Sequence, residues 1–349
     1  MEYRRLGNSG LKVSPICLGT MMFGDQTDEA VAHRIVDSAF GAGINFLDTA
    51  DSYAKGGSER MTGKLIAKNR ERWVLATKVQ NAMIPADPNS GGGGRKWMTF
   101  ELDASLKRLG TDYVDIYYLH RDDLETPVEE TVSTIGDFIR AGKMRYFGLS
   151  NFDGWRIAEI VNTCRRLAVP QPIVLQPVYN AMNRSGEVEM FPACAYYGMG
   201  IVPYSPLARG VLTGKYAPGG KPVSDSRAGR SDRRLLEAEF RGESIKFAKR
   251  IKAYAEKRGM TAGQFALNWV LNNRLVTAVL AGPRTEEQWR EYLGALDHKF
   301  DAGDEALIDG LVAPGHTSTH GYTDPKFPIL GRVPRTWKSS GFNNTQGVK

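Results

Sequence analysis

The chain has 349 residues, of which 42% are hydrophobic and 24% are charged, and this composition excludes a wholly disordered protein. Its longest apolar runs fall far short of the roughly 20 residues that span a bilayer, and its first residues lack the apolar region of a signal peptide. The three cysteines are scattered and odd in number, which indicates neither a disulfide framework nor a zinc site. We therefore expect a globular, cytoplasmic protein without a membrane segment or a bound metal.

Basic residues outnumber acidic ones, with 46 Lys and Arg against 39 Asp and Glu and a formal net charge of +7. Such an excess suits a nucleic acid, a phosphate-bearing cofactor or simple solubility, and composition does not choose among them. The basic residues are dense between 215 and 241 and again between 326 and 349, without the regular aromatic interleaving of single-strand-binding modules. We expect a solvated basic surface and no nucleic-acid partner.

The first element in chain order is a hairpin over residues 3–13, where Asn8-Ser9-Gly10 separates two short extended runs. Short apolar runs then alternate with segments of helical period, a pattern typical of βα units on a parallel sheet. The predicted strands cover residues 16–19, 45–49, 73–79, 114–119, 145–150, 173–177, 200–204 and 277–281. The predicted helices begin at Asp28-Glu29 and at Ser58-Glu59, and later ones cover residues 99–109, 128–141, 155–167, 244–258 and 286–296.

Eight strands that alternate with helices favour a (β/α)8 TIM barrel, which the hairpin plugs at one end. A doubly wound open sheet is the alternative, but it usually has fewer strands and a glycine-rich first turn. Two polar stretches, residues 83–96 and 207–242, follow strand ends and are predicted to be long loops on the catalytic face. We assign residues 1–315 to the barrel and residues 316–349 to a basic C-terminal tail with Gly and Pro, draped over the barrel or partly disordered.

In this fold, catalytic groups lie at the C-terminal ends of the strands and in the loops that follow them. Ionisable residues end three consecutive predicted strands, Asp48 on the second, Lys78 on the third and His120 on the fourth, and Tyr53 lies in the loop after the second. A free tyrosine has a pKa of about 10, and a nearby ammonium such as Lys78 favours its phenolate. Asp48 would pair with the buried lysine, and His120 would donate a hydrogen bond to a carbonyl oxygen or pass a proton to the tyrosine.

Each of these residues also has a structural interpretation. Barrel strand ends often carry ion pairs, so Asp48 and Lys78 by themselves indicate a structural ion pair, and Tyr53 by itself indicates a packing residue. His316 and His320 have the spacing of a metal pair, but no cysteine or acid pair beside them completes a ligand set. The convergence of four reactive residues on one barrel face favours catalysis.

Longer motifs around the same residues resemble the aldo-keto reductase family. These motifs are Asn45-Phe46-Leu47-Asp48-Thr49-Ala50-Asp51-Ser52-Tyr53, Thr77-Lys78, Leu119-His120, Gly148-Leu149-Ser150-Asn151 and Tyr204-Ser205-Pro206-Leu207. The resemblance extends from the hairpin to Leu296 and is greatest to the branch that contains bacterial general-purpose reductases and potassium-channel β subunits. It implies an NADPH-dependent enzyme that reduces an aldehyde or ketone to an alcohol, with Tyr53 as proton donor and Asp48, Lys78 and His120 in supporting roles.

The resemblance also implies which residues hold NADP(H), extended across the barrel mouth without a Rossmann turn. Around the nicotinamide and its ribose these are Thr20, Met21, Asp48, Ser150, Asn151, Gln176 and Tyr204. Along the pyrophosphate and the adenosine end they are Ser205, Pro206, Leu207, Arg209, Lys215, Gly282, Arg284, Gln288 and Glu291. Arg284 stands where many members have a small hydroxyl residue, and a guanidinium there favours a 2′-phosphate and hence NADP over NAD. Glu291-Tyr292 stands where members usually have Glu-Asn.

An apolar substrate pocket beside the four reactive residues has Met22, Phe23 and Trp97 as its candidates. The long loops predict room for a bulky or ring-bearing carbonyl compound. Two other functions stay open, a cofactor-sensing regulatory subunit with slow reductase activity and a Schiff-base aldolase that uses Lys78. The family contains both monomers and homo-oligomers, and the sequence does not choose between them.

Overall fold

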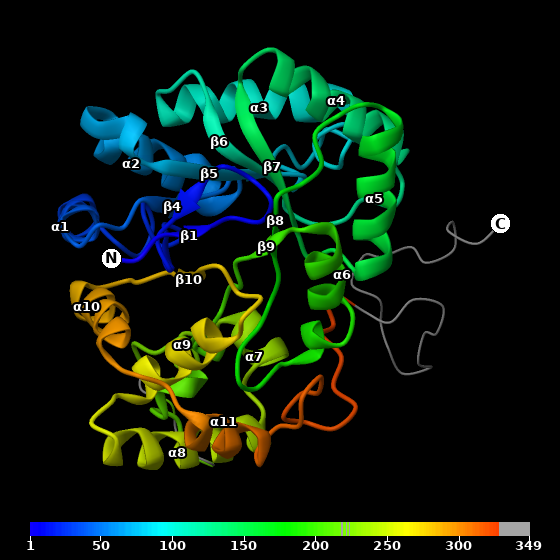
Figure 1. Ribbon diagram of the computed structural model, residues 1–349. Helices are drawn as coiled ribbons and strands as arrows, with labels where there is room; N and C mark the ends of the chain where they lie inside the picture. The colour runs from blue at the N-terminus through cyan, green and yellow to red at the C-terminus, as the bar shows by residue number, and fades with distance from the viewer. Residues whose placement is uncertain (218, 221, 223, 328–349) are drawn as a thin grey trace.

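The computed structural model describes residues 1–217, 219–220, 222 and 224–327 of the chain. Within these residues, eight parallel strands form one curved sheet in the spatial order β10, β3, β4, β5, β6, β7, β8, β9 (Figure 1). The strands are β3 (Ile16–Gly19), β4 (Phe46–Asp48), β5 (Val74–Val79), β6 (Val114–Leu119), β7 (Met144–Ser150), β8 (Val174–Gln176), β9 (Gly200–Ile201) and β10 (Val279–Ala281). The order follows the chain until β10 returns to pair with β3, as in a (β/α)8 barrel.

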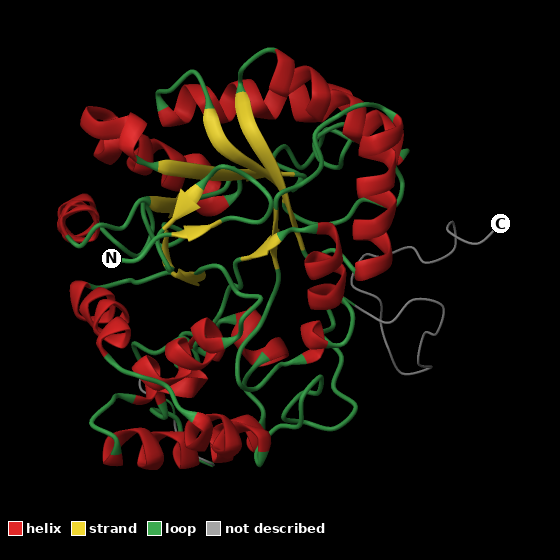
Figure 2. Cartoon of the chain, viewed as in Figure 1, coloured by secondary structure: helices red, strands yellow, loops and turns green. Residues whose placement is uncertain are grey.

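Backbone hydrogen bonds close the sheet between β9 and the segment that leads into β10. The amide of Thr277 donates to the carbonyl of Ile201 at 2.8 Å, and the amide of Leu280 donates to the carbonyl of Pro203 at 2.9 Å. Figure 2 shows the strands at the centre with helices outside them. The strands are short and mostly buried because both faces are covered, which is why they read as apolar runs without alternation. The predicted barrel fold is confirmed.

The N-terminal hairpin covers one end of the barrel. Its strands β1 (Arg4–Arg5) and β2 (Lys12–Val13) pair antiparallel. Leu6 and Val13 are fully buried and pack into the apolar cluster inside the barrel. Gly7 has a φ of +55°, and a Cβ there would lie 2.4 Å from the carbonyl of Ile173, just before β8 begins. The hairpin therefore lies at the N-terminal ends of the strands, which leaves the opposite end for chemistry.

Helices surround the sheet, and most predicted ones are present with small changes in their ends. In the described part of the chain they are α1 (Glu29–Gly41), α2 (Gly57–Ile66), α3 (Arg95–Leu109), α4 (Val128–Arg140), α5 (Gly154–Arg166), α6 (Met190–Tyr197), α7 (Arg233–Ala238), α8 (Gly242–Lys257), α9 (Ala262–Asn272), α10 (Glu286–Gly294) and α11 (Ala302–Asp309). The 3-10 helices there are η1 (Tyr53–Gly56), η2 (Ala67–Arg72), η3 (Ser185–Glu187), η4 (Ala208–Thr213) and η5 (Ala295–Asp297). None of the helices in the described residues is long and apolar enough to cross a membrane.

Two stretches predicted to be loops contain helices. The loop expected over 83–96 is shortened because α3 already begins at Arg95. The connection expected over 207–242 contains η4 and α7, and Asp232 caps α7 by accepting a hydrogen bond from the amide of Leu235 at 2.9 Å. Local capping therefore gives helical structure to a polar, basic segment that lacks a clear apolar period.

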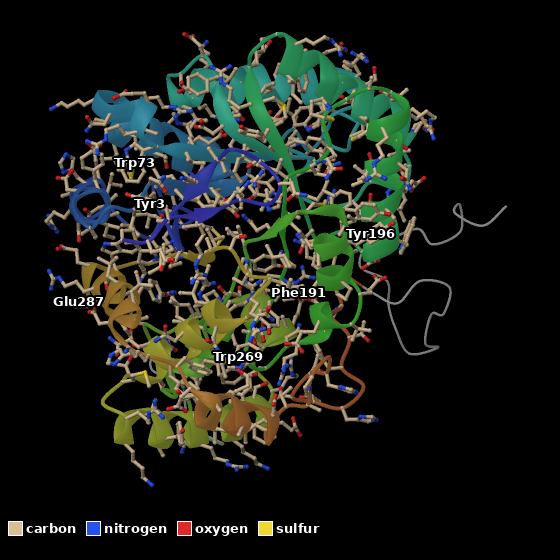
Figure 3. All side chains as sticks on the ribbon, in the orientation of Figure 1. Tyr3, Trp73, Phe191, Tyr196, Trp269 and Glu287 are labelled. Carbon is tan, nitrogen blue, oxygen red and sulfur yellow. The ribbon has the colours of Figure 1, made fainter. Side chains whose placement is uncertain are left out.

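An aromatic cluster joins α6 and α9, two helices that the sequence did not predict. The ring of Tyr179 lies 4.8 Å from that of Phe191 on α6 and 5.0 Å from that of Trp269 on α9, measured between centroids. Figure 3 shows Phe191 and Trp269 inside the molecule, whereas Tyr196 on α6 points outward. Burial of such large rings stabilises the helices on the α9 side of the barrel.

The first part of the predicted tail packs onto the barrel. The amide of Arg184 donates to the carbonyl of His316 at 2.8 Å, and the amide of Ser318 donates to the carbonyl of Met182 at 2.9 Å. Further on, Asp324 forms an ion pair with Arg234 on α7 at 2.6 Å. The rest of the predicted tail, residues 328–349, lies outside the described residues. Residues 316–327 are therefore a fixed part of the surface around the barrel mouth.

Candidate active site

Three ionisable residues lie at the C-terminal ends of neighbouring strands. Asp48 ends β4, Lys78 is the last residue but one of β5, and His120 directly follows β6. These strands are parallel and paired, so their ends lie at the same edge of the barrel. Tyr53 begins η1, a few residues after β4. Asp48, Tyr53 and His120 line one cleft of about 580 Å³, and the buried Lys78 contacts the first two from behind.

Lys78 is fully buried, and each of its three N–H groups has a partner. It forms an ion pair with Asp48, donates to the carbonyl of Thr49 at 2.7 Å, and contacts the hydroxyl of Tyr53 at 3.4 Å. The other carboxylate oxygen of Asp48 accepts a hydrogen bond from Gln176 at 2.8 Å. Burial alone would lower the pKa of Lys78, but the Asp48 carboxylate and the Tyr53 phenol raise it above its ordinary value. Lys78 is therefore a fixed ammonium beside the tyrosine oxygen.

The tyrosine hydroxyl keeps its proton at neutral pH. Burial raises the pKa of Tyr53 above 10.0, and the positive charge of Lys78 offsets only part of this rise. The Lys78 ammonium acts in the predicted direction and favours the phenolate, but burial of the hydroxyl outweighs it. Ala54 and Lys55, which follow the tyrosine, have φ of 48° and 51°, and such left-handed strain is typical of functional sites.

The histidine is oriented by Asn81, a residue that the sequence motifs do not indicate. The amide nitrogen of Asn81 lies 2.9 Å from Nδ1 of His120 and donates to the hydroxyl of Ser52 at 3.1 Å. An amide nitrogen only donates, so Nδ1 accepts and the ring proton is assigned to Nε2. Burial, followed by nearby positive charges, lowers the pKa of His120 well below 6.5. His120 is therefore a neutral ring with an N–H donor at Nε2.

The polar residues expected at the nicotinamide form one hydrogen-bonded network. Asn151 donates to the carbonyl of His120 at 2.9 Å and to the hydroxyl of Ser150 at 3.0 Å, and Tyr204 donates to the amide oxygen of Asn151 at 2.7 Å. Ser150 donates to the carbonyl of Gln176 at 2.8 Å. Asn151 has a φ of 62°, a strained conformation that the network stabilises. The structure thus brings these predicted residues together on one wall of the cleft.

The cleft wall after β9 has features of an anion site. Ser205, Ala208, Arg209 and Gly210 have positive φ, and runs of left-handed residues form backbone concavities that bind anions. The Nε of Arg209 is buried and has no hydrogen-bond partner among the described residues. A buried N–H donor without an acceptor is costly unless a ligand satisfies it. These features fit the pyrophosphate of a dinucleotide.

Several cations share few carboxylates at the end of the cleft where the resemblance places the adenosine. Arg284 binds the exposed Asp225 through two hydrogen bonds, at 2.8 and 2.6 Å, and Asp225 also pairs with Arg230 at 2.9 Å. Burial, followed by the charges of Arg227, Arg284 and Arg230, lowers the pKa of Lys215. A phosphate would meet the fork of Arg284 with the same two-point geometry that the carboxylate uses. The residues present therefore fit a phosphate-bearing cofactor.

With the exception of Thr20, every residue that the resemblance assigns to the cofactor lines this cleft. Thr20 is fully buried, and its hydroxyl donates to the carbonyl of Asp48 at 3.1 Å. Met21 and Met22 also line the cleft, but Phe23 and Trp97 belong to the hydrophobic core. Trp97 is turned inward because α3 begins before it. The substrate-binding roles expected of Phe23 and Trp97 are therefore corrected to packing.

The cleft also contains residues that the sequence motifs do not indicate. On the reaction side they are Ser52, Asn81, Arg121, Arg234, Lys326 and Phe327. The density of basic residues in the sequence is a signal for some of them, although by itself it predicts only a solvated surface. Among the residues that the structure describes, no three His, Cys, Asp or Glu side chains gather as a metal site.

The fold and the site define an oxidoreductase that acts on carbonyl groups. A barrel presents a tyrosine backed by a buried Lys–Asp pair and a neutral histidine, beside a cleft suited to an anionic cofactor. The chain belongs to the aldo/keto reductase family, whose model matches residues 15–313.

Relatives of the chain include bacterial oxidoreductases and plant proteins. An uncharacterized oxidoreductase of Bacillus subtilis, YrpG, is 37% identical over 336 residues, which cover 92% of this chain and 99% of that protein. A probable voltage-gated potassium channel subunit beta of Oryza sativa is 37% identical, over 85% of this chain and 92% of its own. The L-glyceraldehyde 3-phosphate reductase of Escherichia coli K12 is 34% identical, over 90% of this chain and 93% of that protein. These relatives confirm the branch that the motifs predicted.

Proposed function

We propose that the protein is an NADPH-dependent reductase of aldehydes or ketones in which Tyr53 is the proton donor. The observation that carries the proposal is the contact between the Tyr53 hydroxyl and the buried Lys78 ammonium at 3.4 Å, on the wall of a cleft that also receives His120. If the Lys78–Asp48 ion pair had only a structural role, it would need neither a tyrosine hydroxyl in contact with the lysine nor a cleft beside it. When bound, NADPH supplies the hydride that reduces the carbonyl carbon.

Tyr53 holds the proton that reduction consumes. Its raised pKa keeps the hydroxyl protonated until the carbonyl oxygen becomes basic. As the proton leaves, negative charge develops on the Tyr53 oxygen, and the Lys78 ammonium stabilises it without reorganisation because Asp48 already fixes the lysine. Gln176 in turn fixes Asp48, so the proton donor sits on a preorganised chain of charges.

His120 acts as a hydrogen-bond donor to the carbonyl oxygen. A neutral ring with its proton on Nε2 offers one N–H to the cleft, and Nδ1 is occupied by Asn81. Its lowered pKa means that the ring has no second proton to pass on near neutral pH. Tyr53 is therefore the acid, and His120 orients and polarises the carbonyl.

Arg284 would select NADPH over NADH by holding the 2′-phosphate. Its guanidinium already binds one oxyanion, the carboxylate of Asp225, through two hydrogen bonds. Arg209 and Lys215 would hold the pyrophosphate, since both line the cleft and the Nε of Arg209 is unmatched among the described residues. Charge-assisted bonds of this kind contribute roughly 1.5–3 kcal/mol each.

The alternatives fit less well. A Schiff-base lysine attacks as a neutral, free amine, whereas Lys78 is charged, fully buried and bonded to three groups. The plant relatives named as channel β subunits support a cofactor-sensing role with slow chemistry. The full set of Asp48, Tyr53, Lys78 and His120 favours turnover.

The test compares Tyr53→Phe with a matched control, Tyr196→Phe, which changes a tyrosine that is 82% exposed on α6. Oxidation of NADPH is followed against aromatic aldehydes, and binding of NADPH is followed by protein fluorescence. We expect kcat of Tyr53→Phe to fall by about 10³-fold because general acid catalysis contributes about 10²–10⁴-fold. NADPH binding and the control stay unchanged. Full activity of Tyr53→Phe would overturn the mechanism, and tight NADPH binding without turnover by the unmodified protein would favour the sensing role.

A further inference from the structure

The reaction side of the cleft carries positive charge that the proposed mechanism does not use. Arg121, Arg234 and Lys326 line the cleft on this side, together with Tyr53 and His120. They come from the loop after β6, from α7 and from residues 316–327. Three segments distant in sequence therefore place cations around the place where the substrate enters.

The carboxylates next to Arg121 are already bound elsewhere. Asp122 pairs with Arg156 at 2.9 Å. Asp123 accepts hydrogen bonds from the hydroxyl of Thr126 at 2.6 Å and from a backbone amide at 2.7 Å. Among the residues that the structure describes, no carboxylate forms an ion pair with Arg121, which is exposed to the cleft.

Lys326 is in a similar position. Asp324 binds the guanidinium of Arg234 through both oxygens, at 3.1 and 2.6 Å, and one of them also accepts the backbone amide of Lys326 at 2.9 Å. The ammonium of Lys326 has no ion pair within the described residues. Burial, followed by the charges of Arg234 and Arg121, lowers the pKa of Lys326, so these cations lie close enough to repel one another. The Asp324–Arg234 pair thus fixes Lys326 at the cleft with its charge unmatched.

Arg121 lies away from Arg284, the cation that suits a 2′-phosphate. In the sheet order, β6 is the fourth strand after β10, so the two lie opposite each other across the eight-stranded barrel. Arg121 follows β6, whereas Arg284 follows β10. A dinucleotide that reaches from the nicotinamide side to Arg284 leaves Arg121 for another anion, and Lys326 lies close enough to Arg121 to act with it.

We infer that the carbonyl substrate itself carries an oxyanion, a carboxylate or a phosphate, held by Arg121 and Lys326 at the cleft mouth while the carbonyl oxygen meets Tyr53 and His120. The inference rests on the proposed reductase function. A guanidinium can bind such a group through two parallel hydrogen bonds, and the ammonium adds a point charge. Apolar side chains on the same side suit the body of the substrate, namely Met21, Met22 and Phe327.

The test uses pairs of aldehydes that differ in one charge. 4-Carboxybenzaldehyde is compared with its methyl ester, and glycolaldehyde phosphate is compared with glycolaldehyde, so the two arms separate carboxylate from phosphate. The ester group withdraws electrons at least as strongly as the carboxylate, so a preference for the carboxylate reports recognition. We expect kcat/KM to favour the charged member of at least one pair by about tenfold, and this ratio to fall as salt screens the exposed cations.

Variants then assign the preference to the two residues. Arg121→Gln and Lys326→Gln should each lower the charged-to-neutral ratio by about fivefold to tenfold. The matched controls are Arg250→Gln and Lys249→Gln, two exposed positions on α8 that do not line the cleft, and they should leave the ratio unchanged. Equal kcat/KM within both pairs, or a preference that survives both variants, would overturn the inference.

A binding measurement separates this inference from the proposed function. Benzoate and benzamide are titrated by calorimetry into the full chain with saturating NADP⁺. If no aldehyde is reduced but benzoate binds more tightly than benzamide and loses this advantage in Arg121→Gln, the anion site stands and the reductase function is wrong. If aldehydes are reduced without charge preference, and benzoate and benzamide bind equally, the reductase function stands and the anion site is wrong.

Discussion

The two ends of the cleft differ in how their charges are balanced. At the reaction end, the ammonium of Lys78 has partners inside the protein, and Asp48 accepts from both Lys78 and Gln176. At the adenosine end, the balancing carboxylate of Arg284 is the exposed Asp225, and Arg209 has an unmatched buried donor among the described residues. The Lys78–Asp48 pair is balanced within the protein, whereas Arg209 keeps a buried donor without an acceptor among the described residues. Substitutions at the first end should damage folding and catalysis together, and those at the second should damage binding alone.

Removal of the buried lysine should produce the largest effect. Lys78→Met leaves Asp48 as a fully buried carboxylate without its cation, and breaking such a pair costs about 3–5 kcal/mol of the free energy of unfolding. The same change removes the charge that stabilises the Tyr53 oxygen, so kcat should fall by about 10³-fold. Urea unfolding and NADPH oxidation measure the two losses.

A second variant separates the two losses. Asp48→Asn combined with Lys78→Met removes both charges, so much of the lost stability should return because no unpaired charge stays buried. Activity should not return, since the ammonium is still absent. Recovery of activity in the double variant would contradict the role given to Lys78.

Arg284→Gln should weaken cofactor binding without harming the fold. The residue is partly exposed and paired with an exposed carboxylate, so the free energy of unfolding should change little. The dissociation constant for NADPH should rise by about 10- to 100-fold, and that for NADH should stay within about twofold, since only NADPH has the 2′-phosphate. Arg290→Gln, on the exposed side of α10, is the matched control. An equal loss for both nucleotides would show that Arg284 does not recognise the 2′-phosphate.

Asn81 allows a finer test of the reaction end. Asn81→Asp replaces the donor to Nδ1 with an acceptor, which favours a proton on Nδ1 and raises the pKa of His120. We expect kcat/KM to fall by about tenfold, with a new dependence on pH near neutrality. Long-range ¹H–¹⁵N NMR spectra should show the change of tautomer, which a loss of packing alone would not produce. An Nδ1–H tautomer in the unmodified protein would contradict the assignment.

Much of the barrel could be predicted because its strands are buried on both faces. The runs at Ile16–Gly19 and Val114–Leu119 are bounded in the structure as the sequence predicted. The helix α9 was missed because it is apolar on nearly all sides, so its period is weak, although Thr261 and Gln264 form a capping box that was a readable signal. The helix α11 had a similar signal in Asp301.

The reactive residues could be predicted because each stands at or just after a strand end, where the fold fixes its position. Arg234 and Lys326 could not, because they reach the cleft only through the pair between Arg234 and Asp324, which are 90 residues apart in sequence. Asn81 was missed for a related reason. The conformation of the loop after β5 decides which of its residues contacts Nδ1 of His120, and no local sequence pattern predicts that conformation.

Asp51 is a buried carboxylate close to Asp48 in sequence but without a cation. One of its oxygens has no hydrogen-bond partner among the described residues, and the other accepts the amide of Ser52 at 2.6 Å. Burial, followed by repulsion from Glu101 and Glu59, raises the pKa of Asp51 from 3.8 to about 8. Arg108 pairs with both glutamates, so its charge is already shared. Asp51 therefore sharpens the comparison, because it shows how a buried carboxylate near Asp48 in the sequence titrates without a lysine beside it.

The sign of the pH effect follows from the raised pKa. The folded protein keeps the Asp51 proton up to about pH 8, whereas the unfolded chain releases it near pH 3.8, so this group stabilises the fold at low pH and the contribution is lost as pH rises between these values. Asp51→Asn stays neutral at every pH. Its gain in the free energy of unfolding should therefore grow from pH 5 to pH 8, by roughly 3–4 kcal/mol at about 1.4 kcal/mol per pH unit. The matched control Asp112→Asn, at an exposed position, should show no such trend in thermal unfolding. A gain that is equal at both pH values would mean that Asp51 is ionised in the folded protein. The protein would then bury an ionised carboxylate at this position without a cation beside it.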